Sequence, residues 1–301
     1  MCGIVGLFTK NPSHEARLGE LISAMLVEMT GRGPDSAGIA VYRNPAPDDA
    51  VKLVLFSHDD DFNWQHLAKE LDAELADKVS LEVRASHAIL VVHESFEQIR
   101  RWLRERHPEL RLMSAGHAIE IFKEKGLPEE VVRRFHLQDV QGSHAIGHTR
   151  MATESAVTTE HSHPFSTGMD LCLVHNGSLS NHNRLRQVLR RDGGIEFQTD
   201  NDSEVAAGYL TWRMGQGASL REALEAGLKD LDGFYTFCVG TRDGFAVLRD
   251  PIACKHAVLA ETDDWVAMAT EYRAIARLPG AENAKVWEPA PAQVYSWGRA
   301  A

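Results

Sequence analysis

A cysteine stands at position 2, directly before an apolar run at residues 3–8. Once Met1 is removed, Cys2 carries both a thiol and a free α-amine. An amine with a pKa of about 7.7–8.0 can take the thiol proton, a task for which other enzymes recruit a separate histidine. An isolated Cys2 is more often a small apolar residue, so the nucleophile hypothesis depends on the residues that accompany it.

A thiol that attacks a carboxamide needs hydrogen-bond donors aimed at the developing oxyanion. Asn176 and Gly177 follow a predicted strand and precede a predicted helix. The side-chain amide of Asn176 and the backbone N–H of Gly177 offer two such donors. Taken alone, this dipeptide is more typical of an ordinary turn.

A free amino acid presents a carboxylate and an ammonium group, so its binding site needs one fixed cation and one fixed anion. Arg150 suits the carboxylate because its planar guanidinium binds bidentately, and Asp202 suits the ammonium. Without further support, Arg150 is equally typical of a strand end and Asp202 of a helix N-terminus.

Five segments in this order resemble the class II glutamine amidotransferases. They are residues 1–6 (MCGIVG), 32–38 (RGPDSAG), 147–153 (GHTRMAT), 175–177 (HNG) and 201–204 (NDSE). Each is weak alone, but together they span residues 1–204. The resemblance covers residues 1–42 and 143–275 and implies the hydrolysis of L-glutamine to glutamate and ammonia through a Cys2 thioester.

The resemblance also implies roles for individual residues. Cys2, Asn176 and Gly177 match the catalytic positions of the family. The positions that match substrate-binding or supporting residues are Arg150, Asp202, Thr153, Arg32, Asp35 and His163. Of these, Arg32 is expected to position the Cys2 region and Asp35 to hold the geometry of its own loop.

Composition excludes several other functions. The net charge of -11 disfavours contact with nucleic acid, and no apolar run is long enough to span a membrane. No basic segment precedes the first apolar run, so we expect no signal peptide and a cytoplasmic protein. Four sparse cysteines predict reduced thiols. The histidine and cysteine spacing predicts no metal site, and the lack of a glycine-rich phosphate loop predicts no cofactor in this chain.

The elements that must position these residues alternate between hairpins and helix pairs. Apolar spacing predicts helices at 15–29, 181–191, 204–214 and 220–231, and strands at 3–8, 38–42, 145–148, 171–175, 233–240, 245–249, 257–261 and 265–270. This α+β pattern allows the four-layer αββα sandwich of N-terminal-nucleophile hydrolases, which the resemblance implies. We expect residues 1–301 to form a single domain.

Residues 43–142 form an insertion relative to compact members of the family. Two amphipathic helices, near Trp64 and near Phe96, predict that this insertion is helical. Its exposed aromatic residues, Trp64, Phe96 and Trp102, are a candidate docking surface or an ordinary packed layer.

The run from Arg150 to Ser155 differs from the sugar-phosphate amidotransferases and is closer to the glutamate synthase group. The expected partner is therefore a flavin-containing, glutamate-synthase-like subunit, since only about 28 residues follow the matched region. Three alternatives remain open: a subunit of N-methylglutamate synthase, a catalytically silent glutamine-binding regulatory subunit, and an amidase for another amide. Arg150 and Asp202 together argue against the last.

Overall fold

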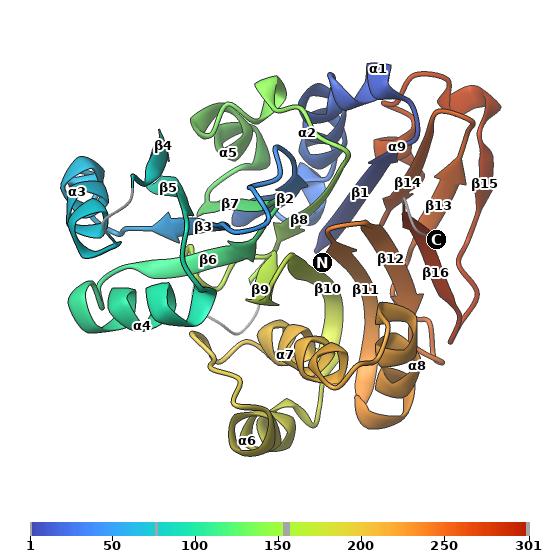
Figure 1. Ribbon diagram of the computed structural model, residues 1–301. Coiled ribbons are helices and arrows are strands. Elements are labelled where there is room, and N and C mark those ends of the chain that lie inside the picture. The colour runs from blue at the N-terminus through green and yellow to red at the C-terminus, as the bar shows by residue number, and fades with distance from the viewer. Residues whose placement is uncertain (1, 76–77, 153–156, 299–301) are drawn as a thin grey trace.

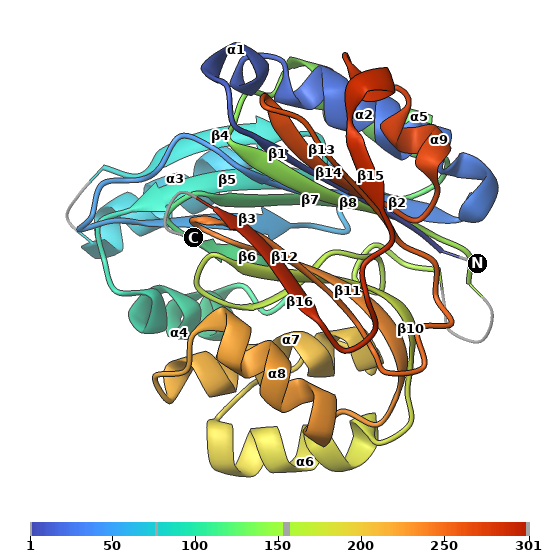
Figure 2. The same cartoon turned by 90° about the vertical axis from the view of Figure 1, so that its right-hand side faces the viewer.

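Two antiparallel sheets lie face to face between outer layers of helices (Figures 1 and 2). This computed structural model describes residues 2–75, 78–152 and 157–298. The larger sheet has the strand order β15 (Lys285–Trp287), β13 (Val258–Glu261), β14 (Trp265–Ala269), β1 (Gly3–Thr9), β8 (His144–Arg150), β2 (Ser36–Tyr42) and β7 (Ile119–Lys125). The second sheet has the order β16 (Val294–Gly298), β12 (Gly244–Arg249), β11 (Gly233–Thr241), β10 (Leu171–Leu179) and β9 (Phe165–Gly168).

Helices cover the outer face of each sheet. The larger sheet is covered by α2 (Leu18–Glu28), α5 (Pro128–Arg134) and α9 (Tyr272–Ile275). The smaller sheet is covered by α7 (Asp202–Gly215) and α8 (Leu220–Asp230), and α6 (His182–Gly193) packs against α7. Short elements complete this part of the chain: α1 (Pro12–Glu15), η1 (Thr30–Arg32), η2 (Leu137–Asp139) and η3 (Ala281–Asn283). The predicted αββα sandwich is confirmed.

Both faces of the central strands are buried, which explains their nearly continuous apolar sequences. In β10, Cys172 and Val174 point into the core between the two sheets, whereas Leu171 and Leu173 pack beneath α7 and its neighbours. Strand alternation therefore sends every second side chain to a different core. Among the described ranges, no helix has the length and apolar character that crossing a bilayer requires.

The insertion differs from the helical one that the sequence predicts. Both expected helices are present, α3 (Trp64–Leu75) and α4 (Phe96–Arg106), but residues 43–142 also contain five strands. One of them, β7, belongs to the larger sheet, and α5 covers that sheet, so below the insertion denotes residues 43–118. Four strands accompany the two helices there. These strands are β3 (Val51–Phe56), β4 (Ser80–Arg84), β5 (His87–Val92) and β6 (Arg111–Gly116), in the antiparallel order β4-β5-β3-β6. A β-α-β-β-α-β succession with this order is a ferredoxin-like arrangement.

The insertion shares a core with the rest of the molecule. Leu53, Leu55 and Leu90 face α3 and α4, whereas Val54 and Ile89 join the core of the larger sheet. The central strands β3 and β5 are buried on both faces and therefore lack a polar alternation, so the sequence pattern did not separate them from buried loops.

The aromatic residues of α3 and α4 belong to this packing. Trp64 is buried, and Phe96 and Trp102 are partly buried against the same apolar cluster. The structure thus favours the packed layer over the docking surface for these three residues.

A buried carboxylate joins the insertion to the smaller sheet. Asp170, in the turn between β9 and β10, accepts hydrogen bonds from the backbone N–H groups of His117, Ala118 and Ile119 at 2.7, 2.8 and 3.0 Å. Its own N–H donates to the Ala115 carbonyl at 2.9 Å. Asp170 adopts a φ of 52°, a left-handed conformation that Asp and Asn tolerate better than most residues.

We expect Asp170→Ala to lower the free energy of unfolding by about 3 kcal/mol, because three buried N–H groups lose their acceptor. Asp170→Asn keeps one acceptor oxygen and the backbone conformation, so its effect should be smaller. Urea unfolding measures both, with the exposed Asp263→Ala as the control. Equal stability of Asp170→Ala and the control would show that this carboxylate does not fasten the insertion.

Candidate active site

The start of β1, the end of β8 and the middle of β10 meet at the cysteine. In the pairing of β1 with β8, Gly3 lies opposite Thr149, so the next residues along, Cys2 and Arg150, lie side by side. The Asn176 Nδ2 atom of β10 donates to the Cys2 carbonyl at 3.3 Å, which joins the smaller sheet to the same point. Cys2 is half-buried and its thiol is free.

Arg150 is held by the loop that precedes β2. The Asp35 N–H donates to the Arg150 carbonyl at 3.1 Å, and the Asp35 carboxylate accepts from the Ala152 N–H at 2.8 Å. Burial lowers the pKa of the Arg150 guanidinium, and its interactions with the neighbouring Cys2, Asp35 and Asp200 oppose that shift. An arginine remains protonated throughout the physiological range, so a fixed positive charge lies beside the cysteine.

The turn at Gly33 allows this close packing. A Cβ atom at Gly33 would lie 2.5 Å from the backbone of Arg150, closer than atoms pack. Asp35 thus joins its own loop to the end of β8 and to Ala152.

Gly177 follows Asn176 with a φ of 151°, which glycine adopts readily and other residues rarely do. A Cβ atom there would lie 2.0 Å from the Phe234 carbonyl of β11. The backbone therefore requires glycine next to Asn176, and the ordinary turn considered above is replaced by a continuous strand from Leu171 to Leu179.

Asp202 begins α7 and also holds the end of β10. Its Oδ2 atom accepts from the Leu179 N–H at 2.8 Å, and its side chain is 22% exposed. The preceding Asn201 caps the helix through the Ser203 N–H at 2.8 Å. Asp202 therefore keeps a fixed position and retains access to solvent, which an anion for a substrate ammonium group requires.

Behind Asn176 lies a buried cluster of three histidines. The Ser203 hydroxyl contacts His163 Nε2 at 2.8 Å and His175 Nδ1 at 2.9 Å. His148 Nε2 donates to the His175 carbonyl at 3.1 Å and stacks on His163 at 4.0 Å. These contacts tie β8, β10 and the first turn of α7 to one another.

Burial keeps the three imidazoles neutral. It lowers the pKa of His148 to about 3, and it lowers the pKa of His163 well below its usual value. The pKa of His175 is also lowered by burial, against the opposing charge of Asp202. In each ring one nitrogen makes a hydrogen bond, and the other has no partner within the described part of the chain. This pattern matches a neutral ring, whose second nitrogen carries no proton.

Among the residues matched by resemblance, Arg32 lies apart from the proposed substrate-binding residues, and Thr153 cannot be placed. The Arg32 Nη1 atom pairs with Glu271 at 2.9 Å, next to Thr270, whose hydroxyl accepts from the Ile4 N–H at 2.8 Å. Arg32 therefore anchors η1 beside the start of β1, and any contact of Arg32 with substrate stays a prediction. Thr153 lies outside the described residues.

Ser203 and His148 were not predicted as site residues, although both occur in the matched segments. His175 was quoted in its segment but given no role. Their spacing along the chain carries no sign of contact, because His148 and Ser203 come from elements 55 residues apart. Within the described ranges, the histidine, cysteine and acidic side chains form no group of three or more that could hold a metal ion.

The face-to-face sheets, with a cysteine at the start of a central strand, define the class of N-terminal-nucleophile amidotransferases. The family model of the glutamine amidotransferase domain matches residues 148–277. The glutamine amidotransferase-like protein GlxB of Rhizobium meliloti is 53% identical, covering 99% of this chain and 98% of that protein. A putative glutamine amidotransferase of Methanothermobacter thermautotrophicus is 31% identical over 98% of this chain and 99% of its own length. The chain therefore belongs to the class II glutamine amidotransferase family.

Solved structures agree on the fold. The glutamine phosphoribosylpyrophosphate amidotransferase of B. subtilis, solved with ADP and GMP, superimposes with a TM-score of 0.63 at 20% identity. That match covers 99% of this chain and 48% of the solved one, so the chain spans about half of that enzyme's length.

The histidine cluster predicts a specific acid sensitivity. Because the folded pKa of His148 is about 3 and the usual value is near 6.5, the unfolded chain binds more protons between these values. Stability should be constant above about pH 6.5 and fall as the pH decreases from there towards 3. Urea unfolding at a series of pH values measures this slope.

The variant His148→Gln can still donate to the His175 carbonyl but cannot titrate, so it should show a shallower slope. The exposed His66→Gln serves as the control and should keep the wild-type slope. If His148→Gln and wild type lose stability in parallel, another group is responsible.

Proposed function

We propose that this chain hydrolyses L-glutamine to glutamate and ammonia, with Cys2 as the nucleophile once Met1 has been removed. The observation that carries the proposal is the meeting of Cys2, the Asn176 amide and the Arg150 guanidinium at one point. Each comes from a different strand, and each matches a family position. The identity of the family supports the substrate class.

In the proposed first step, the α-amine of Cys2 takes the thiol proton and the thiolate attacks the side-chain carbonyl of glutamine. The Asn176 Nδ2 donor lies 3.3 Å from the Cys2 carbonyl. It could therefore donate a hydrogen bond to the oxyanion of a substrate bonded to the Cys2 sulfur. Together with the Gly177 N–H it would stabilise the oxyanion. Such donors contribute roughly 3–4 kcal/mol each in amide-cleaving enzymes.

The proposed second step completes the reaction. The protonated α-amine returns its proton to the leaving nitrogen, which departs as ammonia and leaves a γ-glutamyl thioester on Cys2. Water, activated by the same amine, then attacks the thioester and releases glutamate.

The amino-acid head of glutamine would lie between Arg150 and Asp202. Arg150 would bind the α-carboxylate through two parallel hydrogen bonds, and Asp202 would bind the α-ammonium. Asp35 holds Arg150 through the end of β8, and Leu179 holds Asp202. Thr153 is proposed as a further substrate contact because of its match to the family.

The ammonia would pass to a partner. We propose a flavin-containing, glutamate-synthase-like subunit, with a subunit role in N-methylglutamate synthase as the alternative. A catalytically silent glutamine-binding subunit is the second candidate, and the activity of processed protein separates it from the first.

The nucleophile is tested by substitution and by mass. Protein that begins at Cys2 should hydrolyse glutamine, and Cys2→Ala should lose the activity while still binding glutamine. The exposed Cys254→Ala supplies the matched thiol control. Intact-mass analysis identifies the first residue, and full activity in protein that retains Met1 would contradict the role of the amine.

Two conservative substitutions test how the α-carboxylate and the α-ammonium of glutamine are bound. Arg150→Lys should raise the KM for glutamine by at least about tenfold, because lysine lacks the bidentate fork. Asp202→Asn should act similarly by removing the charge opposite the α-ammonium. The exposed pair Arg191→Lys and Asp192→Asn provides controls of the same chemistry. Unchanged steady-state constants in both site variants would place the substrate elsewhere.

A further inference from the structure

A cavity of about 240 Å³ lies between the insertion and the remainder of the molecule, away from Cys2. Its walls come from α4, β3 and β6 of the insertion, from β9, and from the segment at residues 196–204. A water molecule takes up roughly 30 Å³, so the cavity has room for a small metabolite. None of the proposed catalytic or substrate residues lines it.

One part of the cavity wall is apolar. Leu53, Leu55, Leu103 and Leu110 lie there, and all four belong to the core of the insertion. Such a surface favours a ligand with an apolar body.

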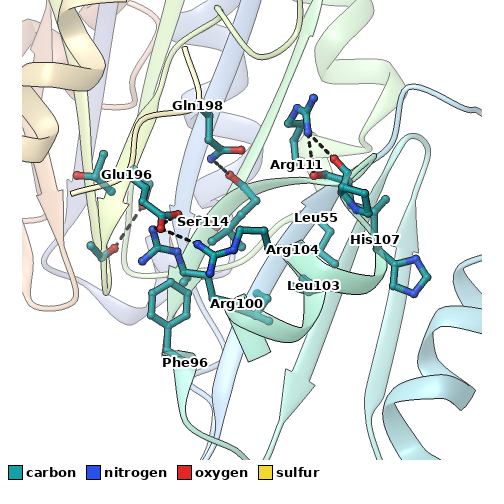
Figure 3. A pocket seen from close by; sticks show the side chains of 18 of the residues that line it. Leu55, Phe96, Arg100, Leu103, Arg104, His107, Arg111, Ser114, Glu196 and Gln198 are labelled. Carbon is teal, nitrogen blue, oxygen red and sulfur yellow. Dashed lines mark hydrogen bonds and ion pairs between the residues drawn. The ribbon is translucent and has the colours of Figure 1, made fainter. Parts of the chain in front are cut away.

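Cationic side chains line another part of the wall. Figure 3 shows Arg100 and Arg104 converging on Glu196, at 2.7 Å each, so two guanidinium groups share one carboxylate. Arg111 donates to the carbonyls of Pro108 and Leu110, which leaves its charge without an anionic partner among the described contacts. The Glu204 carboxylate also lines the cavity, but it accepts from the backbone N–H groups of Gln198 and Thr199. Three guanidinium groups thus face two carboxylates, which favours an anionic ligand.

A buried hydroxyl also lines the cavity. Ser114 is 1% exposed, and its Oγ atom has no hydrogen-bond partner within the described part of the chain. A buried polar group without a partner costs free energy, and a ligand with a polar substituent would remove that cost.

We propose that this cavity binds a small organic carboxylate with an apolar body and a hydrogen-bonding substituent. The carboxylate of the ligand pairs with Arg100 and Arg104 in competition with Glu196. The apolar body lies against the leucines, and the substituent contacts the Ser114 hydroxyl. This binding site is independent of the proposed glutaminase activity.

The site is connected to α7. Glu196 is held by Arg100 and Arg104, and the Gln198 side chain donates to the Leu112 carbonyl at 2.8 Å. The next residue, Thr199, is bonded to Glu204 in the first turn of α7. A ligand that displaces Glu196 therefore loosens the segment at residues 196–199, and this loosening is measurable without any assay of catalysis.

The first experiment measures the binding of phenylacetate to the full chain by calorimetry, with the uncharged phenylacetamide as the comparison ligand. Arg100→Gln combined with Arg104→Gln should weaken phenylacetate binding at least tenfold. Arg104→Gln alone should weaken it less, and Arg101→Gln, an exposed neighbour on α4 outside the cavity, should leave it unchanged. Hydrogen exchange at residues 196–199 should increase when phenylacetate binds.

The second experiment tests the hydroxyl. 4-Hydroxyphenylacetate should bind several-fold more tightly than phenylacetate, and Ser114→Ala should remove that difference. The proposal is overturned if neither carboxylate shows saturable binding, if phenylacetamide binds equally well, or if the double arginine variant binds phenylacetate like wild type. A difference between the two carboxylates that persists in Ser114→Ala overturns the role of that hydroxyl.

Discussion

The register between β1 and β8 is the constraint on which the rest of the site depends. Gly3 lies opposite Thr149, and both strands are buried on both faces. A slip by one residue would send every side chain to the opposite face of the sheet. The register is therefore fixed strongly, and it brings Cys2 beside Arg150. Close packing supports this placement, since a Cβ at Gly3 would lie 2.8 Å from Thr149 Oγ1.

The second sheet is joined to the candidate active site through neutral, buried imidazoles. Ser203 contacts His163 and His175, and His148 bonds to the His175 carbonyl, so the strand that carries Asn176 is tied to α7 and to β8. Buried polar networks of this kind hold one arrangement firmly when their groups are satisfied. Their cost is sensitivity to acid, because burial disfavours the charged form of each imidazole.

The insertion is part of the same packed body. Its small sheet shares one face with the main core, and Asp170 fastens its last strand to the β9–β10 turn. Ionic and polar contacts from Arg100, Arg104 and Leu112 reach the segment that precedes α7. Thus α7 begins with Asp202, a proposed substrate residue, and the segment that precedes it is contacted by the insertion. The proposed small-molecule site lies between that segment and the insertion.

The sequence by itself determined the family through five ordered segments, and that resemblance implied the αββα architecture. Strand and helix periodicities, which are local properties, predicted many of the elements. It also singled out Cys2, Asn176, Arg150 and Asp202, whose chemistry is visible in their residue types. Only the tertiary structure decided that Arg32 pairs with Glu271, that Ser203 joins two histidines, and that the insertion contains a sheet. Pairing between distant residues leaves no trace in their spacing, and strands covered on both faces lose the alternation that would reveal them.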